Sequence, residues 1–299
     1  MIKKEIIRDL YINKRMSSDS IAKKLGMKHG KTVRRWLEKH NIPRRTISES
    51  ITKYPKTSFG KDLKLKAYML GLRAGDVHAR RIHKVIRVQT TTTHPAQVEM
   101  MNKTFGNFSN VGKHTFFNKN FNIKQWFVYC DLNESFSFML QKPEEIPEWI
   151  MHDNRCFYNF IAGYSDSEGS WKILKSHDNS VRFVFQLGSQ DKKILNQIIK
   201  KFRQLRYAPN IYLDTKVGVS RQGKNVNADI YRIMMYRTKN VLELAKILLP
   251  LSRHQEKIDK INLILRSEGR NWSDIKDEIS KLRNDIKDSR LQNQTIYNT

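Results

Sequence analysis

The pattern of apolar and polar positions along the chain divides it into five segments. The first segment has apolar side chains at helical spacing, and the second is polar without clear periodicity. The third and fourth segments each begin with an apolar helix and continue with alternating, strand-like sequence, and the last is a charged helix. Helices and strands arranged in this way predict an α+β protein. The predicted boundaries are 1–45 for a helical domain, 46–61 for a linker, 62–145 and 146–268 for two halves that contain helices and strands, and 269–299 for a C-terminal helix and tail.

Three short helices are predicted in the N-terminal segment, over residues 2–13, 19–25 and 28–40. Gly26 is expected to form the turn before the third helix, and Pro43 follows its end. One face of the third helix is basic, which suits a helix that contacts DNA, and a helical cap with a solvated basic face is the alternative. The side chains on this face are Lys31, Thr32, Arg34, Arg35 and Lys39.

A short stretch of sequence occurs twice, once near the start of each of the two halves. Residues 68–78 read YMLGLRAGDVH, and residues 160–171 read FIAGYSDSEGSW. Both copies predict a helix with small residues four positions apart, a spacing that allows two helix backbones to approach closely. The matched positions are Gly71 with Gly163, Gly75 with Ser167, and Asp76 with Glu168.

Each copy of this repeat ends in an acidic residue. A carboxylate at a helix C-terminus faces the negative end of the helix dipole, which is unfavourable. If the two helices pack through their small residues, Asp76 and Glu168 come together and repel each other unless a cation lies between them. The repeat therefore predicts a metal site at the helix interface.

The sequence after each repeat alternates in the way that strands with one buried face do. Arg87, Gln89 and Thr91 fall on one face of a predicted strand in the first half, and Gln186 lies in a similar strand of the second half. The two acids are 92 positions apart (168 − 76) and the two glutamines 97 (186 − 89), as expected for a repeat with modest insertions.

The charge of the chain predicts a polyanionic partner. It contains 56 Lys and Arg against 29 Asp and Glu, a formal net charge of +27, which predicts strongly salt-dependent binding to DNA, RNA or an anionic membrane. No apolar run reaches 18 residues and the N-terminus lacks the apolar core of a secretory signal, so no membrane association is expected. Cys130 and Cys156 are too few for a disulfide framework or a zinc site. A reducing compartment, cytoplasmic or organellar, is expected.

The repeat resembles the paired motifs of LAGLIDADG homing endonucleases, in the form that carries both motifs on one chain. Residues 17–43 resemble helix-turn-helix domains of the resolvase and homeodomain-like type. The resemblance implies two pseudo-symmetric αββαββα halves that form a saddle over double-stranded DNA, in a monomer with an internal pseudo-two-fold axis. It also implies a staggered double-strand cut by phosphodiester hydrolysis with Mg²⁺, for which Mn²⁺ can substitute.

The resemblance also assigns roles to individual residues. Asp76 and Glu168 match the metal-binding acids of the family, and Gln89 and Gln186 match the position that orients the hydrolytic water. Arg232 matches a basic residue on the last strand of a half. Outward strand positions are expected to reach base edges or phosphates, and a solvated strand face is the alternative for any one of them. The candidates are Arg80, Arg87, Lys172, Lys175, Arg182 and Arg237.

The first motif departs from the family pattern. Arg73 and Ala74 stand where an apolar residue and an aspartate are usual, whereas the second motif keeps this aspartate as Asp166, which is expected to be structural. The last strand of the first half offers no basic side chain at the position of Arg232. Either Lys113 or Lys124 is expected to take the role of that side chain, or the two halves are expected to cut at unequal rates.

Two other functions fit the same features. A transcription regulator on this fold would bind DNA without cutting it, but the paired acids argue against it. An RNA-splicing maturase shares the fold and the basic charge, and only the helix-turn-helix segment favours DNA over RNA. No splicing-domain sequence is present at either end, so an intein is not expected.

Overall fold

The computed structural model describes residues 3–45, 54–119, 122–221 and 224–295. The first part of the predicted linker, residues 46–53, lies outside these ranges. The chain divides into two compact units, 1–55 and 56–299. Of the helices in the described ranges, none combines the length and hydrophobicity that a membrane crossing requires.

The N-terminal unit is helical and has its own small core. Ile7, Ile21, Val33 and Leu37 are fully buried and hold its helices together. The predicted helix over 2–13 differs in its second half, which is a π-helix with one extra residue in the turn. Leu10 and Tyr11 are buried in this turn, as the helical spacing of apolar residues predicts. The elements are α1 (Lys4–Arg8), η1 (Asp9–Asn13), α2 (Ser18–Lys24) and α3 (Gly30–Lys39).

The larger unit contains two four-stranded antiparallel sheets with the same order of strands. The orders are β1-β2-β4-β3 and β5-β6-β10-β7. A small hairpin, β8 (Ser220–Arg221) with β9 (Lys224–Asn225), extends the connection between β7 and β10. The strands of the sheets are β1 (His78–Ile82), β2 (Val85–Thr92), β3 (Val111–Asn118), β4 (Ile123–Leu132), β5 (Gly169–Lys175), β6 (Val181–Ser189), β7 (Asn210–Thr215) and β10 (Ile230–Met235).

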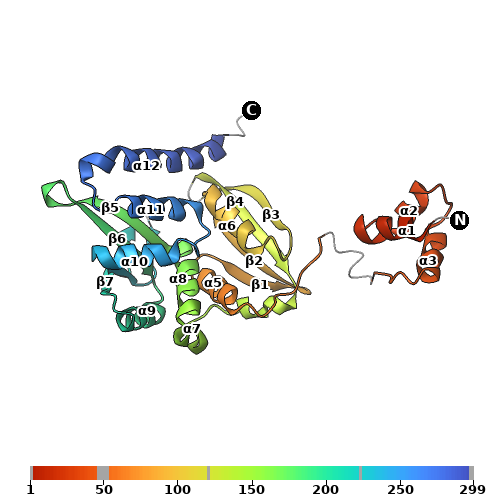
Figure 1. Ribbon diagram of the computed structural model, residues 1–299, viewed down its shortest axis with the longest axis horizontal. Helices are drawn as coiled ribbons and strands as arrows, with labels where there is room; N and C mark the ends of the chain where they lie inside the picture. The colour runs from red at the N-terminus through yellow and green to blue at the C-terminus, as the bar shows by residue number, and fades with distance from the viewer. Residues whose placement is uncertain (1–2, 46–53, 120–121, 222–223, 296–299) are drawn as a thin grey trace. The chain divides into compact units, whose positions relative to one another are not determined.

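Helices α5 (Leu63–Ala74) and α8 (Asn154–Glu168) pack against each other between the two sheets (Figure 1). The Asp62 side chain caps α5 by accepting a hydrogen bond from the Leu65 amide at 3.0 Å. A Cβ atom at Gly71 would lie 2.2 Å from the carbonyl oxygen of Phe160, so only glycine allows this approach. The predicted close contact between the two motif helices is therefore present.

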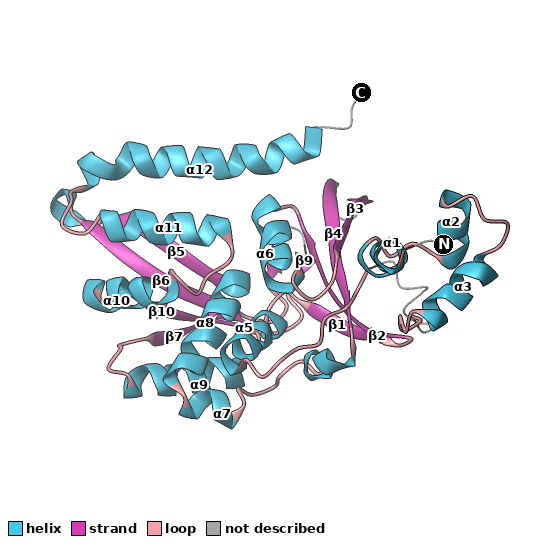
Figure 2. Cartoon of the chain, turned by 45° about the vertical axis from the view of Figure 1, so that its right-hand side comes forward, coloured by secondary structure: helices cyan, strands magenta, loops and turns pink. Residues whose placement is uncertain are grey.

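Further helices cover one face of each sheet. Figure 2 shows α10 and α11 running beside the strands of the second sheet, and contacts join α10 to β6 and α11 to β5. On the first sheet, α6 contacts β2, β3 and β4. The remaining helices are α6 (Pro95–Phe105), η2 (Glu134–Met139), α7 (Glu148–His152), η3 (His177–Asn179), α9 (Lys192–Gln204), α10 (Thr238–Leu248), α11 (Gln255–Arg266) and α12 (Trp272–Thr295).

A charge network joins α11, α12 and the start of α6. His94 Nδ1 lies 3.0 Å from Glu256 Oε1, and Arg290 donates to Glu256 Oε2 at 2.8 Å. Burial acts to raise the pKa of Glu256, but the hydrogen bonds from His94 and Arg290 outweigh it and hold the pKa at about 2. The C-terminal helix is therefore anchored to both halves of the larger unit.

Candidate active site at the helix interface

The two motif acids lie at the same end of the α5–α8 pair. Glu168 is the last residue of α8, and Asp76 follows Gly75, the C-cap of α5. A Cβ atom at Gly75 would lie 2.5 Å from Ser167 Cβ and 3.2 Å from Glu168 Cγ, so the ends of the two helices touch. The predicted juxtaposition of the acids therefore follows from the small residues in the helices.

The neighbourhood of these acids disfavours their ionised forms. Burial, followed by the negative charge of Asp76, raises the pKa of Glu168 to about 7. Asp76 is exposed along much of its side chain, yet desolvation by the surrounding protein raises the pKa of its carboxyl group. Two carboxylates with raised pKa values at one place form a site that a cation would stabilise.

Lys257, in the first turn of α11, places a positive charge near the two acids. Its ammonium group donates a hydrogen bond to the carbonyl oxygen of Gly169, the residue that follows Glu168. Its charge lowers the pKa values of Asp76 and Glu168, while burial lowers the pKa of Lys257 itself to about 8. No sequence motif identifies Lys257, because it lies 89 residues after Glu168 (257 − 168).

The two glutamines occupy matching positions on the second strand of each sheet. Gln89 pairs with His78 on β1, and Gln186 pairs with Ser170 on β5. His78 and Ser170 each come two residues after a motif acid, at 76 + 2 and 168 + 2. The side-chain oxygen of each glutamine is buried without a hydrogen-bond partner among the described residues. A buried amide oxygen of this kind calls for a ligand or a water molecule.

These residues fit a divalent metal such as Mg²⁺. Carboxylate and amide oxygens are the hard donors that Mg²⁺ prefers, and a typical site has one or two carboxylates with water and phosphate as the other ligands. Within the described ranges, no group of three or more Asp, Glu, His or Cys side chains could hold a metal ion alone. A metal between Asp76 and Glu168 would therefore take its remaining ligands from amide or backbone carbonyl oxygens, water or phosphate.

Arg232 lies close to Gln186, on the same face of the second sheet. It pairs with Gly188 on β6, and its guanidinium donates to Asp214 at 2.9 Å. The matching position in the first sheet is Phe127, since it pairs with Thr91 as Arg232 pairs with Gly188. The first half therefore has an aromatic ring where the second half has a cation.

Lys113 and Lys124 do not replace the missing cation. Lys113 pairs with the buried Val128 and lies near the ring of Trp126, on the helix-covered face of the sheet. Lys124 shares the parity of Val128 along β4, and both lysines therefore point away from the face that carries Gln89. Of the two alternatives, a substitute lysine is therefore wrong, because both lysines alternate onto the face that the helices cover. The basic group nearest to Gln89 in the strand register is His78.

Asp166 has the structural role expected of it. Its Oδ2 atom accepts hydrogen bonds from the Tyr68 hydroxyl at 2.7 Å and from the backbone amides of Arg253 and His254 at 2.7 and 3.3 Å. Burial raises its pKa to about 6, and these hydrogen bonds act against that rise. Asp166 thus holds the start of α11, and with it Lys257, against the motif helices.

The departures at Arg73 and Ala74 have a local explanation. The buried Arg73 guanidinium donates to the carbonyl oxygens of Met139 and Leu140 at 2.8 and 3.3 Å. In the second half, the Asp166 carboxylate accepts hydrogen bonds from backbone amides at the start of α11. In the first half, the Arg73 guanidinium donates hydrogen bonds to backbone carbonyl groups at the end of η2. Arg73, one position before the residue that corresponds to Asp166, therefore binds the end of η2 to α5, as Asp166 binds the start of α11 to α8.

The candidate nucleic-acid contacts fall into three groups. Arg80, Arg87, Lys172 and Arg182 share the outward face with the glutamines, but Arg87 is held by Asp131 through two hydrogen bonds. Lys175 shares the parity of the inward Trp171 and Ile173, and Arg237 lies beyond β10 as the N-cap of α10, so the structure does not place these two on that face. In the N-terminal unit, the basic face of α3 is exposed except for the half-buried Arg34. Its exposed members are Lys31, Thr32, Arg35 and Lys39.

An aromatic cluster on the outward face of the first sheet was not anticipated. The rings of His114, Phe127 and Tyr129 lie within 5.0 to 6.2 Å of each other, centroid to centroid, and Arg87 lies over Tyr129. Alternation along β4 could have placed Phe127 and Tyr129 on one face, but only the register with β3 adds His114.

No protein-family model and no curated protein matches the chain. Solved structures with a similar course of the chain include the homing endonucleases I-WcaI and I-DmoI and a mutant of I-SmaMI. The homing endonuclease I-WcaI bound to its DNA recognition sequence is 16% identical, with a TM-score of 0.47 over 68% of this chain and 88% of that chain. I-DmoI in complex with DNA and Ca is 15% identical, with a TM-score of 0.41 over 64% and 93%. A point mutant of I-SmaMI is 10% identical, with a TM-score of 0.40 over 78% and 99%. The chain is thus similar to solved homing endonucleases, but at scores too low to transfer residue roles or an activity.

Proposed function

We propose that this protein is a homing-type, sequence-specific endonuclease that cuts both strands of a long DNA site in a metal-dependent reaction. The observation that supports this most strongly is the pairing of Asp76 with Glu168 where α5 and α8 end. Two carboxylates with raised pKa values, beside glutamine oxygens without partners among the described residues, suit a divalent cation and a water molecule. The net charge of +27 suits a polyanionic substrate.

The proposed architecture is a monomer with two pseudo-symmetric αββαββα halves. The equal strand order of the two sheets supports it. Their outward faces, with Arg80, Lys172 and Arg182, would form a saddle in the major groove. The N-terminal unit would act as a helix-turn-helix domain that lengthens the recognised site through the exposed basic face of α3.

Asp76 and Glu168 would hold Mg²⁺, with Mn²⁺ as a substitute. The metal would neutralise charge on the scissile phosphate and make a bound water more acidic. Each acid would serve one strand, and the resulting cut would be staggered. Lys257 would favour the ionised forms of both carboxylates, because its charge lowers their pKa values and so opposes the larger effect of burial.

The other residues of the site would orient the water and the phosphate. The amide oxygens of Gln89 and Gln186 can accept a hydrogen bond from the attacking water in each half. Arg232 would contribute positive charge near the phosphate of one strand, after exchanging its contact with Asp214 for one with the phosphate. The first half lacks such a cation at the position of Phe127, so unequal rates for the two strands are part of this proposal.

A second candidate function is DNA binding without cleavage. The ion pair between Arg232 and Asp214 and the aromatic ring of Phe127 in the first half both favour it. The acids argue against it, because a regulator has no need to retain two carboxylates whose ionised forms are disfavoured at the helix ends.

Selection from a random DNA library tests these functions without knowledge of the target. Duplexes would be enriched with the full-length protein in Ca²⁺ and then transferred to Mg²⁺. Asp76→Asn and Glu168→Gln would be compared with the wild type and with Asp277→Asn, which removes an exposed acid on α12. Double-strand cutting by the wild type and by Asp277→Asn, but by neither motif variant, is the expected result.

Other outcomes of this selection contradict the proposal in distinct ways. Enriched duplexes that stay intact in both Mg²⁺ and Mn²⁺ would identify a DNA-binding regulator. Cleavage that survives both motif substitutions would place the active site elsewhere. No enrichment of any duplex would point to RNA, and the same selection with an RNA library would then test a maturase.

A further inference from the structure

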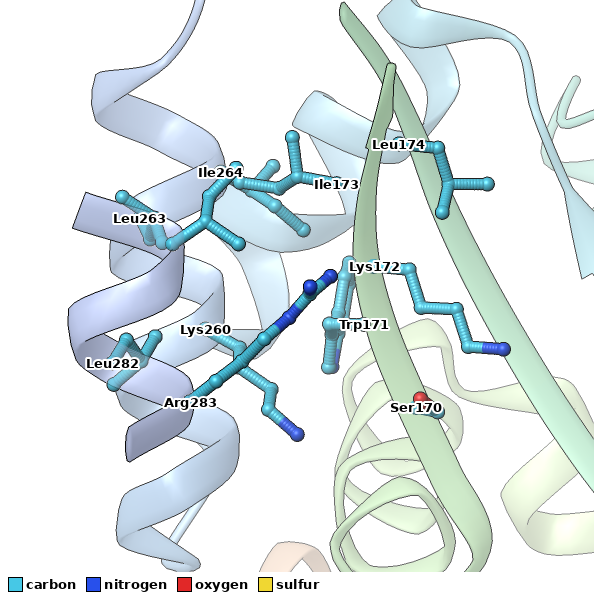
Figure 3. A pocket seen from close by; sticks show the side chains of 11 residues that line it. Ser170, Trp171, Lys172, Ile173, Leu174, Lys260, Leu263, Ile264, Leu282 and Arg283 are labelled. Carbon is cyan, nitrogen blue, oxygen red and sulfur yellow. The ribbon is translucent and has the colours of Figure 1, made fainter. Parts of the chain in front are cut away.

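A pocket separate from the paired acids lies between the edge strand β5 and helices α11 and α12. Its volume is about 240 Å³, enough for a single ring system but smaller than usual for a drug-sized ligand (Figure 3). The walls are mainly apolar, from Ile173, Leu263 and Ile264, with Trp171 at the strand side. Trp171 and Ile173 have the opposite parity to Ser170, which pairs with Gln186, so the pocket lies on the helix side of the sheet.

Trp171 has an unsatisfied hydrogen-bond donor at this pocket. The residue is 2% exposed, and its indole Nε1 atom is buried without a partner among the described residues. An indole N–H usually finds an acceptor when it is buried, because an unpaired buried donor loses the hydrogen bonds that it makes with water. Trp171 lines the pocket, so a molecule bound there could supply that acceptor after a small shift of the side chains that cover Nε1.

Two cations on the helix side of the pocket also lack acidic partners within the described part of the chain. Lys260 and Arg283 project from α11 and α12 toward Trp171, whereas Lys172 extends to the other side of β5 (Figure 3). Among the described residues no salt bridge involves Lys260 or Arg283, although the neighbouring Arg266 and Arg290 are paired with acids. Burial lowers the pKa of Lys260, the charge of Glu256 raises it, and the charges of Arg290 and Arg283 lower it. An anion between Lys260 and Arg283 would relieve their repulsion.

We propose that this pocket binds a nucleoside monophosphate. The base would lie between the apolar walls and accept a hydrogen bond from Trp171 Nε1, and the phosphate would lie between Lys260 and Arg283. A nucleotide combines the three features that the pocket requires, namely a flat ring, an acceptor on that ring and an anionic group. It could come as a free mononucleotide or as the unpaired, 5′-phosphorylated end of a DNA strand, which the proposed nuclease would meet at its substrate.

Nuclear magnetic resonance of the full-length protein tests this site directly. The indole signal of Trp171 is identified by its absence in Trp171→Phe, and thymidine monophosphate is then added without divalent metal. We expect the Trp171 signal to shift, with affinity at least about tenfold weaker for thymidine or inorganic phosphate alone, since each makes only part of the contacts. Lys260→Gln and Arg283→Gln should each weaken nucleotide binding by about tenfold.

Lys281→Gln is the matched control, because Lys281 is an exposed cation on the same helix that does not line the pocket. Equal loss of affinity in Lys281→Gln and Arg283→Gln would show unspecific attraction and overturn the proposal. A Trp171 signal that no concentration of nucleotide moves would overturn it as well. Calorimetric titration of Arg283→Gln gives a second measurement that does not depend on Trp171→Phe folding.

Two DNA probes distinguish the source of the nucleotide. A duplex with a 5′-phosphorylated single-stranded overhang should shift the Trp171 signal if strand ends bind, and a blunt duplex without 5′-phosphates should not. A shift with the mononucleotide but with neither duplex would identify a free ligand. Because these titrations use no metal and no cleavage, their failure would leave the test of the endonuclease with Asp76→Asn unaffected.

Discussion

Gly71 and Gly163 each face the backbone of the opposite motif helix. A Cβ atom at Gly163 would lie 2.1 Å from the carbonyl oxygen of Tyr68, and one at Gly71 would lie 2.2 Å from that of Phe160. No rotamer can relieve these contacts, because both atoms of each contact belong to the backbone or to Cβ. The distance between α5 and α8, and with it the distance between the acids at their ends, depends on these two glycines.

Replacing Gly163 by alanine should therefore destabilise the protein. The helices would have to separate, at a cost of about 1–3 kcal/mol or more, as for other overpacked sites. Thermal unfolding would measure the loss, and Gly60→Ala is the control, since nothing lies within 4 Å of a Cβ atom there. Equal melting temperatures for Gly163→Ala and Gly60→Ala would contradict the close packing.

Glu168→Gln should stabilise the metal-free protein at pH 8 but not at pH 4. The pKa of Glu168 is raised to about 7 in the folded state, so the folded protein holds its proton more tightly than the unfolded chain. The resulting penalty is absent below the unfolded pKa, appears as the pH rises, and is complete above about 7. Melting temperatures across this range should converge at low pH, and a constant difference would contradict the raised pKa.

Lys257→Met should increase the dependence of the protein on divalent metal. Without this ammonium group the two carboxylates repel each other more strongly in the metal-free state, and Mg²⁺ no longer competes with a fixed cation. At pH 7, where Lys257 with a pKa of about 8 is mainly protonated, we expect a half-saturating Mg²⁺ concentration roughly threefold to tenfold lower for the variant. Lys276→Gln, at an exposed position of α12, is the control and should match the wild type. An unchanged response of Lys257→Met to Mg²⁺ would show that its charge does not act on the acids.

The two strands of a DNA target should be cut at unequal rates. Arg232 has no counterpart in the first half, where Phe127 occupies the matching position. On a supercoiled plasmid with the selected site, we expect a nicked intermediate before the linear product. Arg232→Gln should slow one strand by about tenfold to a hundredfold and leave the other unchanged. Equal slowing of both strands would mean that Arg232 acts on binding and not on one cut.

Much of the fold followed from local sequence patterns. The repeat identified the packed helices, because the spacing of glycines determines how closely two helix backbones approach. Asp62 was predictable as the N-cap of α5, because it directly precedes the apolar run of that helix. The face of Gln89 and Arg87 was predictable from alternation, since β2 is buried at every second position.

The rest of the site depends on contacts between distant segments. Lys257 reaches the acids only because Asp166 binds the amides before α11, and no spacing encodes that contact. Strand register, which decides that Phe127 matches Arg232, requires the pairing of β4 and β10 with their neighbours. The face of Lys113 was left open for the same reason, because it depends on the register of β3 with β4. Lys175 was placed wrongly, although its alternation with Trp171 and Ile173 assigns it to the inward face of β5.

The hydrogen bond between Tyr68 of the first half and Asp166 of the second half can form only between two unlike halves. Because the repeat offset is 92, Phe160 corresponds to Tyr68 and Ala74 corresponds to Asp166. A pair of second halves would set Asp166 against a phenylalanine without a hydroxyl group, and a pair of first halves would set Tyr68 against an alanine. Halves expressed as separate polypeptides should therefore pair first half with second half, and neither half should pair with a copy of itself.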